Sequence, residues 1–213
     1  MRITKFGHAC VRLETGGQVV VLDPGVFTET EAVDGASAVL ITHEHPDHYS
    51  PDHLRRTDAP VFTIEAVAAK IREEAPDVAE RLTVVEPDQE LEVAGVPTRV
   101  VGEKHAVIHP ELPHFDNSGY LLEADGRSVY HPGDSLTLPP TDVDVLLLPV
   151  SAPWLKVSEC IDFGRDVGAP QALAIHDKIY SELGLGVIDG HLQRFLGERD
   201  VEYVRLEPGA DLS

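Results

Sequence analysis

Hydrophobic and polar residues alternate in short runs along this chain, and the runs predict many short strands with helices between them. Residues 3–6, 10–14 and 19–23 alternate like half-buried strands, and Gly16 and Gly17 mark the hairpin turn between the last two. Residues 38–42 form a continuous apolar run, as expected of a strand that is buried on both faces. The same patterns predict further strands at 60–63, 82–85, 90–93, 98–101, 119–123, 127–131, 143–149, 172–175 and 201–206.

Helical spacing of apolar residues occurs in fewer places. Residues 64–74 and 157–167 are amphipathic with a period close to 3.6 residues, and shorter helices are predicted at 50–54 and 188–196. Strands and helices occur in both halves, and no linker, low-complexity stretch or short repeat separates them. We therefore expect one α+β domain over residues 1–213, in which two mixed sheets pack face to face with helices outside.

Length and cysteine content bound the class of protein. A chain of 213 residues with 42% hydrophobic content buries a core large enough to need no disulfides. The two cysteines, Cys10 and Cys160, predict free thiols in a reducing compartment. The start shows no basic, apolar leader, and no run of about 20 apolar residues follows. We expect a cytoplasmic protein without a membrane span.

Charge narrows the choice of partner. The formal net charge is -20, with 37 acidic residues against 17 basic ones. Phosphate backbones and anionic membranes are bound chiefly by lysine and arginine, so this balance disfavours both as partners. A small-molecule substrate is the expected partner, with no nucleic acid and no membrane.

Ligand-type side chains crowd residues 43–48, which read His-Glu-His-Pro-Asp-His directly after an apolar strand. His43 and His45 are two positions apart, so both imidazoles point the same way in an extended segment. Asp47 and His48 follow a turn that the proline imposes. Four such side chains cannot all bind one tetrahedral ion, but they can serve two ions a few Å apart. A polar surface loop, the alternative, explains neither their density nor their place at a strand end.

Four segments carry a resemblance to a known family. Residues 43–48 resemble the His-x-His-x-Asp-His signature of the metallo-β-lactamase superfamily. Residues 6–9 (Phe-Gly-His-Ala), followed by Leu-Asp-Pro at 22–24, resemble the opening of its L-ascorbate-6-phosphate lactonase-like branch. His-Pro-Gly-Asp at 131–134 resembles the superfamily's Gly-Asp motif, and Ala-Ile-His at 174–176 resembles its strand-end histidine. The resemblance implies a four-layer αββα sandwich with a metal site at the strand ends along one edge.

The resemblance also implies two divalent metal ions, with zinc foremost and manganese or iron as alternatives. It assigns three ligands to the first ion, namely His43, His45 and His105. It assigns three ligands to the second ion, namely Asp47, His48 and His176. Asp134 would bridge the two ions together with a water or hydroxide. The third ligand of the first ion stays open between His105, which lies just past a predicted strand, and His109 in the same loop.

Several residues near these motifs are candidates for contact with the substrate, namely His8, His109, His114 and Trp154. His8 lies between two predicted strands and either faces the site or makes structural hydrogen bonds. Trp154 follows a buried strand and either lines a pocket or packs in the core. Asp23 is expected to orient a metal-bound histidine or to cap its turn.

These features predict a dinuclear metal-dependent hydrolase of small esters, lactones or phosphoesters. A hydroxide that bridges two metal ions would attack the substrate, with Asp47 and Asp134 as the catalytic carboxylates. Asp47 is expected to take the proton of the nucleophile and later donate it to the leaving group. The alternatives are a metal-dependent nuclease or phosphodiesterase, a β-lactamase, and a non-catalytic metal-binding protein. The acidic net charge disfavours a nuclease, and the lack of a leader at the start disfavours a secreted β-lactamase. The filled ligand positions disfavour a non-catalytic protein.

Overall fold

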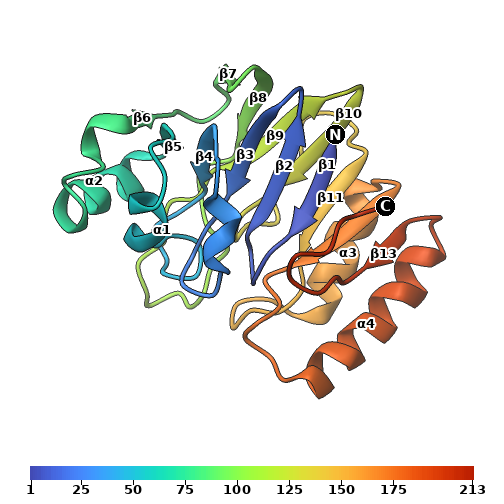
Figure 1. Ribbon diagram of the computed structural model, residues 1–213. Helices are drawn as coiled ribbons and strands as arrows, with labels where there is room; N and C mark the ends of the chain where they lie inside the picture. The colour runs from blue at the N-terminus through green and yellow to red at the C-terminus, as the bar shows by residue number, and fades with distance from the viewer.

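The computed structural model describes residues 1–213, and its strands form two mixed sheets (Figure 1). The first sheet has the order β1-β2-β3-β4-β5-β6. Its strands are Arg2–Lys5, Val11–Thr15, Gln18–Leu22, Ala38–Ile41, Val61–Thr63 and Leu82–Val84. The strands β1 to β3 pair antiparallel, and β3 to β6 pair parallel. The parallel part is built from the continuous apolar runs, because parallel strands are buried on both faces.

The second sheet has the order β13-β12-β11-β10-β9-β8-β7. In chain order its strands are Glu90–Val93, Val96–Val101, Gly119–Ala124, Arg127–His131, Val145–Pro149, Gln171–Ile175 and Glu202–Val204. The strands β7 to β10 pair antiparallel, whereas β10 to β13 pair parallel. Both sheets are therefore mixed, as the sequence predicts.

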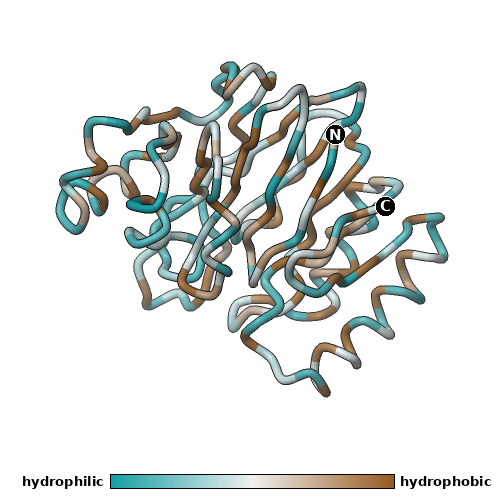
Figure 2. The backbone as a smooth tube through the Cα atoms, viewed as in Figure 1, coloured by the Kyte–Doolittle hydropathy of each residue, from teal (hydrophilic) through white to brown (hydrophobic).

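Helices cover the outer faces and complete the four layers (Figure 1). The helices α1 (Pro51–Arg55) and α2 (Glu65–Glu74) pack against the first sheet. The helices α3 (Val157–Val167) and α4 (Glu182–Gly197) pack against the second. One buried cluster fills the space between the sheets, and another lies between the second sheet and its helices. Figure 2 shows hydrophobic residues concentrated along the strands, whereas α4 alternates between hydrophobic and hydrophilic positions. The predicted αββα sandwich is confirmed.

The boundaries differ from the prediction mainly in α4, which begins six residues before the predicted 188–196. Four glycines in this helix lower its propensity, and its first turns expose Leu183 by 82% and Val187 by 58%, so the apolar period is obscured. Ser181 begins the helix by accepting a hydrogen bond from the backbone N–H of Gly184 at 3.3 Å. Two 3₁₀ turns, η1 (Thr30–Val33) and η2 (Ala79–Arg81), were not predicted because one turn leaves no periodic signal.

None of the helices is both long enough and apolar enough to cross a lipid bilayer. The feature of the fold that matters for function is the alignment of strand ends. The strands β3 and β4 run parallel in the first sheet, and β10, β11 and β12 run parallel in the second. Parallel strands end at one sheet edge, so the segments that follow them gather there.

Candidate metal centre

The predicted ligands come from segments that directly follow these strands. His43 lies two residues past β4, and Asp23 follows its parallel neighbour β3. Asp134 lies three residues past β10, and His176 follows β12 at once. The loop between β8 and β9 contributes His105, whose backbone N–H donates to Phe115 O at 3.1 Å. Five segments that are distant in sequence thus meet at one site.

The side chains form two adjoining groups, and within each group the ligand atoms all lie within 4.8 Å of one another. The first group consists of His43, His45, His105 and Asp134. The second group consists of His8, Asp47, His48 and His176. All seven residues that the resemblance assigns to the two ions are therefore brought together, and one further histidine joins them. The structure places His105 in the first group and His109 outside both.

Asp134 lies between the two groups and is almost fully buried. Its Oδ2 is 3.3 Å from His105 Nε2 in the first group and 3.2 Å from His176 Nε2 in the second. Its Oδ1 is 3.1 Å from His48 Nε2. The carboxylate therefore faces ligand atoms of both groups with both oxygens, which is the placement expected of a bridging ligand.

The hydrogen bonds of the histidine rings indicate what the centre is built to hold. Three rings donate a hydrogen bond from Nδ1 to an oxygen atom. His48 donates to Asp23 Oδ2 at 2.6 Å, His105 to Ala106 O at 2.5 Å, and His176 to Ser151 O. The Nε2 atoms of all three rings are buried without a hydrogen-bond partner, and so is Oδ1 of Asp134.

An unsatisfied buried polar atom costs about 1–3 kcal/mol, and here four of them converge on one point. A divalent cation satisfies such atoms at once, because neutral imidazole nitrogens and carboxylate oxygens are its usual ligands. The residues therefore fit a metal centre, and the Nδ1 bonds fix which nitrogen each ring offers.

The charge balance of the centre points the same way. Burial lowers the pKa of His43 well below its usual value. Burial also lowers the pKa of His48 and His176. The negative charge of nearby carboxylates outweighs this effect, and Asp134 contributes most. The pKa of His48 is raised well above its usual value, and that of His176 is raised to about 9. Burial also works against ionisation of Asp134, yet the neighbouring histidines hold its pKa well below the usual range. The buried carboxylate thus requires positive charge beside it.

Asp23 fixes ligands of both groups from behind. Its Oδ1 accepts the backbone N–H of Thr42 at 2.8 Å, and its Oδ2 accepts the hydroxyl of Thr42 at 2.7 Å. Because that hydroxyl donates to Asp23, its oxygen accepts from His43 Nδ1 at 3.0 Å. The same Oδ2 accepts from His48 Nδ1. The expected orienting role of Asp23 is thus matched by its contacts, and it reaches one histidine in each group.

A glycine beside Asp134 lets the backbone approach the centre. Gly133 has φ +64°, and a Cβ there would lie 2.2 Å from Asn117 Oδ1 and 2.8 Å from the Cβ of Thr42. Asn117 Oδ1 accepts the backbone N–H of Asp134 at 3.0 Å. Only glycine fits this turn, which aims the carboxylate inward as its sequence position predicts.

The four predicted substrate contacts lie in different places. Trp154 donates its indole Nε1–H to Asp134 Oδ2 at 3.0 Å, and its ring lies 5.7 Å from that of His105. His8 is completely buried beside Asp47. His109 is exposed on the loop between β8 and β9, away from the two groups. His114 is exposed as well, and its Nε2 donates to the backbone oxygen of His105 at 2.8 Å.

Aromatic residues that were not among the four predicted substrate contacts also lie at the site. The ring of Phe27 lies 5.4 Å from that of His8, and the ring of Phe115 lies 4.7 Å from that of His45. The hydroxyl of Tyr180 donates to Ala152 O at 3.2 Å, two residues before Trp154. No local pattern marks Phe27 and Tyr180, because each joins the site through the fold.

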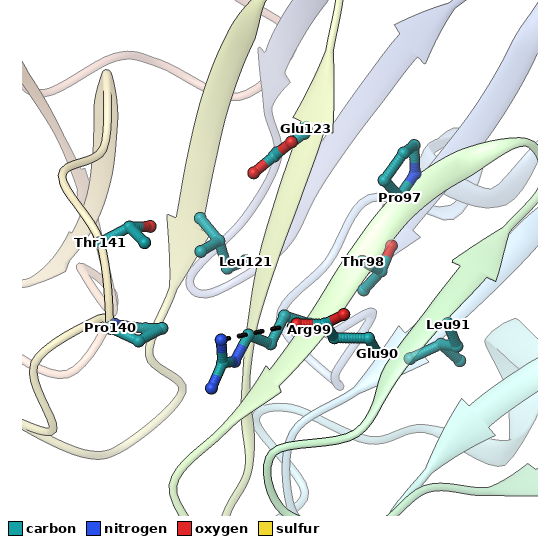
Figure 3. A pocket seen from close by; sticks show the side chains of 9 residues that line it. All are labelled: Glu90, Leu91, Pro97, Thr98, Arg99, Leu121, Glu123, Pro140 and Thr141. Atoms are coloured by element: carbon teal, nitrogen blue, oxygen red, sulfur yellow. Dashed lines mark ion pairs between the residues drawn. The ribbon is translucent and has the colours of Figure 1, made fainter.

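A separate hollow on the outer face of β7, β8 and β9 shares no residue with this centre (Figure 3). Figure 3 shows Arg99 and Glu90 on its floor, joined by an ion pair of 3.6 Å. Its walls come from Glu123 and from the loop at Pro140 and Thr141. It offers no histidine or cysteine, and both groups of side chains that lie close enough together to hold a metal ion are at the strand ends.

Comparisons with known proteins agree with this fold and centre. The Beta-lactamase superfamily domain matches residues 2–176. Protein Rv0786c of Mycobacterium tuberculosis is 38% identical over 198 residues, which cover 90% of this chain and 91% of that protein. A UPF0173 metal-dependent hydrolase of Methanosphaerula palustris is 29% identical over 189 residues, with 83% of each chain covered. The crystal structure of the metallo-beta-lactamase fold protein YhfI from Bacillus subtilis superposes with a TM-score of 0.75, covering 99% of this chain and 98% of that one at 13% identity.

The chain therefore belongs to the beta-lactamase superfamily. It is a metal-dependent hydrolase of the metallo-β-lactamase fold, as the sequence predicts. The narrower resemblance to the L-ascorbate-6-phosphate lactonase-like branch stays a prediction.

Proposed function

We propose that this protein hydrolyses a small carboxylic ester or lactone with two divalent ions held in the strand-end centre. The observation that carries the proposal is the convergence of unsatisfied ring nitrogens and a carboxylate oxygen at one buried point. His43, His45 and His105 would hold one ion, and Asp47, His48 and His176 the other, with Asp134 between them. When bound, two such ions lower the pKa of water toward neutrality and polarise the oxygen of the substrate.

The carboxylates of Asp134 and Asp47 differ in solvent exposure, and this difference suits them to different roles. Only 4% of the Asp134 side chain is exposed, whereas 18% of the Asp47 side chain is exposed. Asp134 is therefore suited to holding position. Asp47 is the carboxylate that a leaving group can reach, so it is suited to accepting a proton and passing it on.

The surroundings of the centre favour an apolar substrate over a phosphorylated one. Phe27, Phe115 and Trp154 pack against rings of the two groups. Exposed aliphatic side chains stand beside the same loops: the backbone of Val26 donates to Pro46 O at 2.8 Å, and Val107 follows Ala106, which donates to Asp134 O at 2.8 Å. Such walls bind the hydrocarbon part of an ester or lactone by removing it from water.

Basic side chains near the centre are few and engaged. Lys5 is buried and pairs with Asp177 at 3.3 Å, and Lys104 pairs with Asp116. Lys178 alone is exposed without an ion-pair partner beside the centre. Phosphate recognition uses several charge-assisted hydrogen bonds, usually from arginine. One lysine therefore supports a neutral ester or lactone better than a phosphoester.

A substrate panel tests this proposal. Purified protein is stripped with a chelator, reloaded separately with zinc, manganese or iron, and assayed on p-nitrophenyl butyrate, an alkyl lactone, p-nitrophenyl phosphate, bis(p-nitrophenyl) phosphate, nitrocefin and single-stranded DNA. We expect metal-dependent turnover of the first two, and kcat/KM for the butyrate about tenfold or more above that for the matching acetate. Preferred turnover of a phosphodiester or of nitrocefin would replace this proposal with the nuclease or β-lactamase alternative. A folded protein that binds none of the three metals would refute it altogether.

A further inference from the structure

His8 lies among the ligand atoms, yet its hydrogen bonds differ from those of His48, His105 and His176. It sits in the loop between β1 and β2 with φ 60°, and its side chain is completely buried. Its Nε2 is 3.1 Å from Asp47 Oδ2. Position alone would make it a fourth ligand beside Asp47, His48 and His176.

The backbone decides which ring nitrogen carries the proton. The N–H of Lys178 donates to His8 Nδ1 at 3.1 Å. A backbone amide is always a donor, so Nδ1 must offer its lone pair and carries no hydrogen. The single hydrogen of the neutral ring is then on Nε2, and Nε2 donates it to Asp47.

The ligand histidines have the opposite arrangement. In His48, His105 and His176 a hydrogen is on Nδ1 and faces an oxygen acceptor, so Nε2 is the nitrogen that can offer its lone pair to an ion. To bind an ion through Nε2, a neutral ring must carry its hydrogen on Nδ1, and in His8 the N–H of Lys178 occupies that position. His8 therefore lies in the group without being equipped as a ligand, and its burial removes it from contact with a substrate.

We infer that His8 is a positioning residue that sets the second half of the metal centre by donating its Nε2–H to Asp47. Its backbone oxygen also accepts the N–H of His176 at 3.0 Å. One residue thus connects the loop after β4 to the end of β12, the two segments that supply Asp47 and His176. The inference rests on the proposed metal centre, and it replaces contact with the substrate as the role of His8.

Two substitutions distinguish the two hydrogen bonds of the His8 ring. In His8→Asn, the amide oxygen can still accept from Lys178, but the side chain is too short to reach Asp47. In His8→Gln, the amide nitrogen reaches the position of Nε2 and can donate to Asp47. Asparagine also tolerates a positive φ, so His8→Asn carries the smaller backbone penalty of the pair.

The test is competitive titration of zinc against a chromophoric chelator for the wild type and both variants, with thermal unfolding of the metal-free proteins as a folding control. We expect His8→Asn to bind one of its two ions about 10–100-fold more weakly than the wild type, because an orienting partner of a ligand is lost. His8→Gln should retain most of the affinity for that ion, although it is at least as strained.

Three results would overturn the inference. Wild-type affinities in His8→Asn would show that the bond to Asp47 has no effect. Equal weakening of both ions in both variants would indicate a general structural role. Complete loss of one ion in His8→Gln would make His8 a ligand. Because the readout is metal affinity, failure of the substrate panel would leave the inference standing, whereas a wild type that binds no metal would refute both proposals.

Discussion

The indole of Trp154 donates a hydrogen bond of 3.0 Å to Asp134 Oδ2, the oxygen that also faces His105 and His176. The only tryptophan of the chain is thus joined to the carboxylate that lies between the two groups of ligands. Removal of this donor leaves part of a buried carboxylate unpaired, and hydrogen bonds to charged groups contribute about 1.5–3 kcal/mol.

Trp154→Phe is therefore expected to keep the fold and lower kcat by about tenfold to a hundredfold, since about 1.4 kcal/mol corresponds to a factor of ten. Steady-state kinetics on the best ester of the panel measures this loss. A phenyl ring preserves the apolar wall, so KM should change little. A rise in KM at unchanged kcat would instead make Trp154 a wall residue only.

The same contact makes Trp154 a reporter of metal occupancy. Addition of zinc to the metal-free protein should change the tryptophan emission, and the change should saturate at about two ions per chain if the centre is dinuclear. The Trp154→Phe variant serves as the optical blank. Saturation at a single ion would contradict the dinuclear centre.

Asp23→Asn tests the orientation of ligands from behind the centre. Asparagine tolerates the φ of 45° at this position, but it can no longer offer two acceptor oxygens to Thr42 and His48. We expect zinc affinity to fall by about 10–100-fold, measured by chelator competition. The matched control is Asp200→Asn, at an exposed residue with φ 59° far from the site, which should bind zinc like the wild type. Equal losses in both variants would contradict the role of Asp23.

Much of the fold follows from local sequence because its strands are short and strongly patterned. Each predicted strand exists, since alternation or a continuous apolar run sets burial within one strand. Local reasoning fails where a helix lacks a clean apolar stripe, as in the first turns of α4.

The site likewise contains residues that local sequence predicts and residues that only the fold identifies. The ligands at 43–48 are adjacent in sequence and could be predicted from spacing alone. His105 and His109 share one loop, so only the fold separates them. The role of His8 depends on the backbone N–H of Lys178, which is 170 positions away, so no local pattern reveals it. Residues that act through long-range hydrogen bonds are the ones that require the structure.

Metal binding is expected to release protons. In the metal-free protein the pKa of His176 is raised to about 9 and that of His48 lies well above its usual value, so both rings are protonated at neutral pH. A cation must displace these protons to reach Nε2, so about two protons should leave per chain and zinc affinity should fall as pH is lowered. Calorimetric titration in buffers of different ionisation enthalpy counts the protons. No dependence on the buffer would contradict this assignment.

The same shifts predict how the metal-free fold responds to pH. A histidine whose folded pKa is raised stabilises the fold fully below its unfolded pKa, near 6.5, and this contribution is lost as pH rises through the folded value. Chemical unfolding of the metal-free protein should therefore show that these histidines contribute less stability at pH 9 than at pH 6. Replacement of His176 by Asn should flatten this part of the profile. An unchanged profile in the variant would contradict the raised pKa.

Gly133→Ala tests the close approach that aims Asp134 into the centre. The new Cβ combines a positive φ with a collision against Asn117 and Thr42, so we expect a loss of about 2–4 kcal/mol in the free energy of unfolding. Gly126→Ala is the matched control, because its φ is +73° and no atom lies within 4 Å of the added Cβ. It carries the backbone penalty alone, about 1 kcal/mol. Urea unfolding of the metal-free proteins gives both values. Since Asn117 holds the backbone of Asp134, Gly133→Ala should also bind zinc more weakly, whereas Gly126→Ala should not. Equal destabilisation with equal zinc affinity in the two variants would show that the turn at Gly133 tolerates a side chain and does not position the carboxylate.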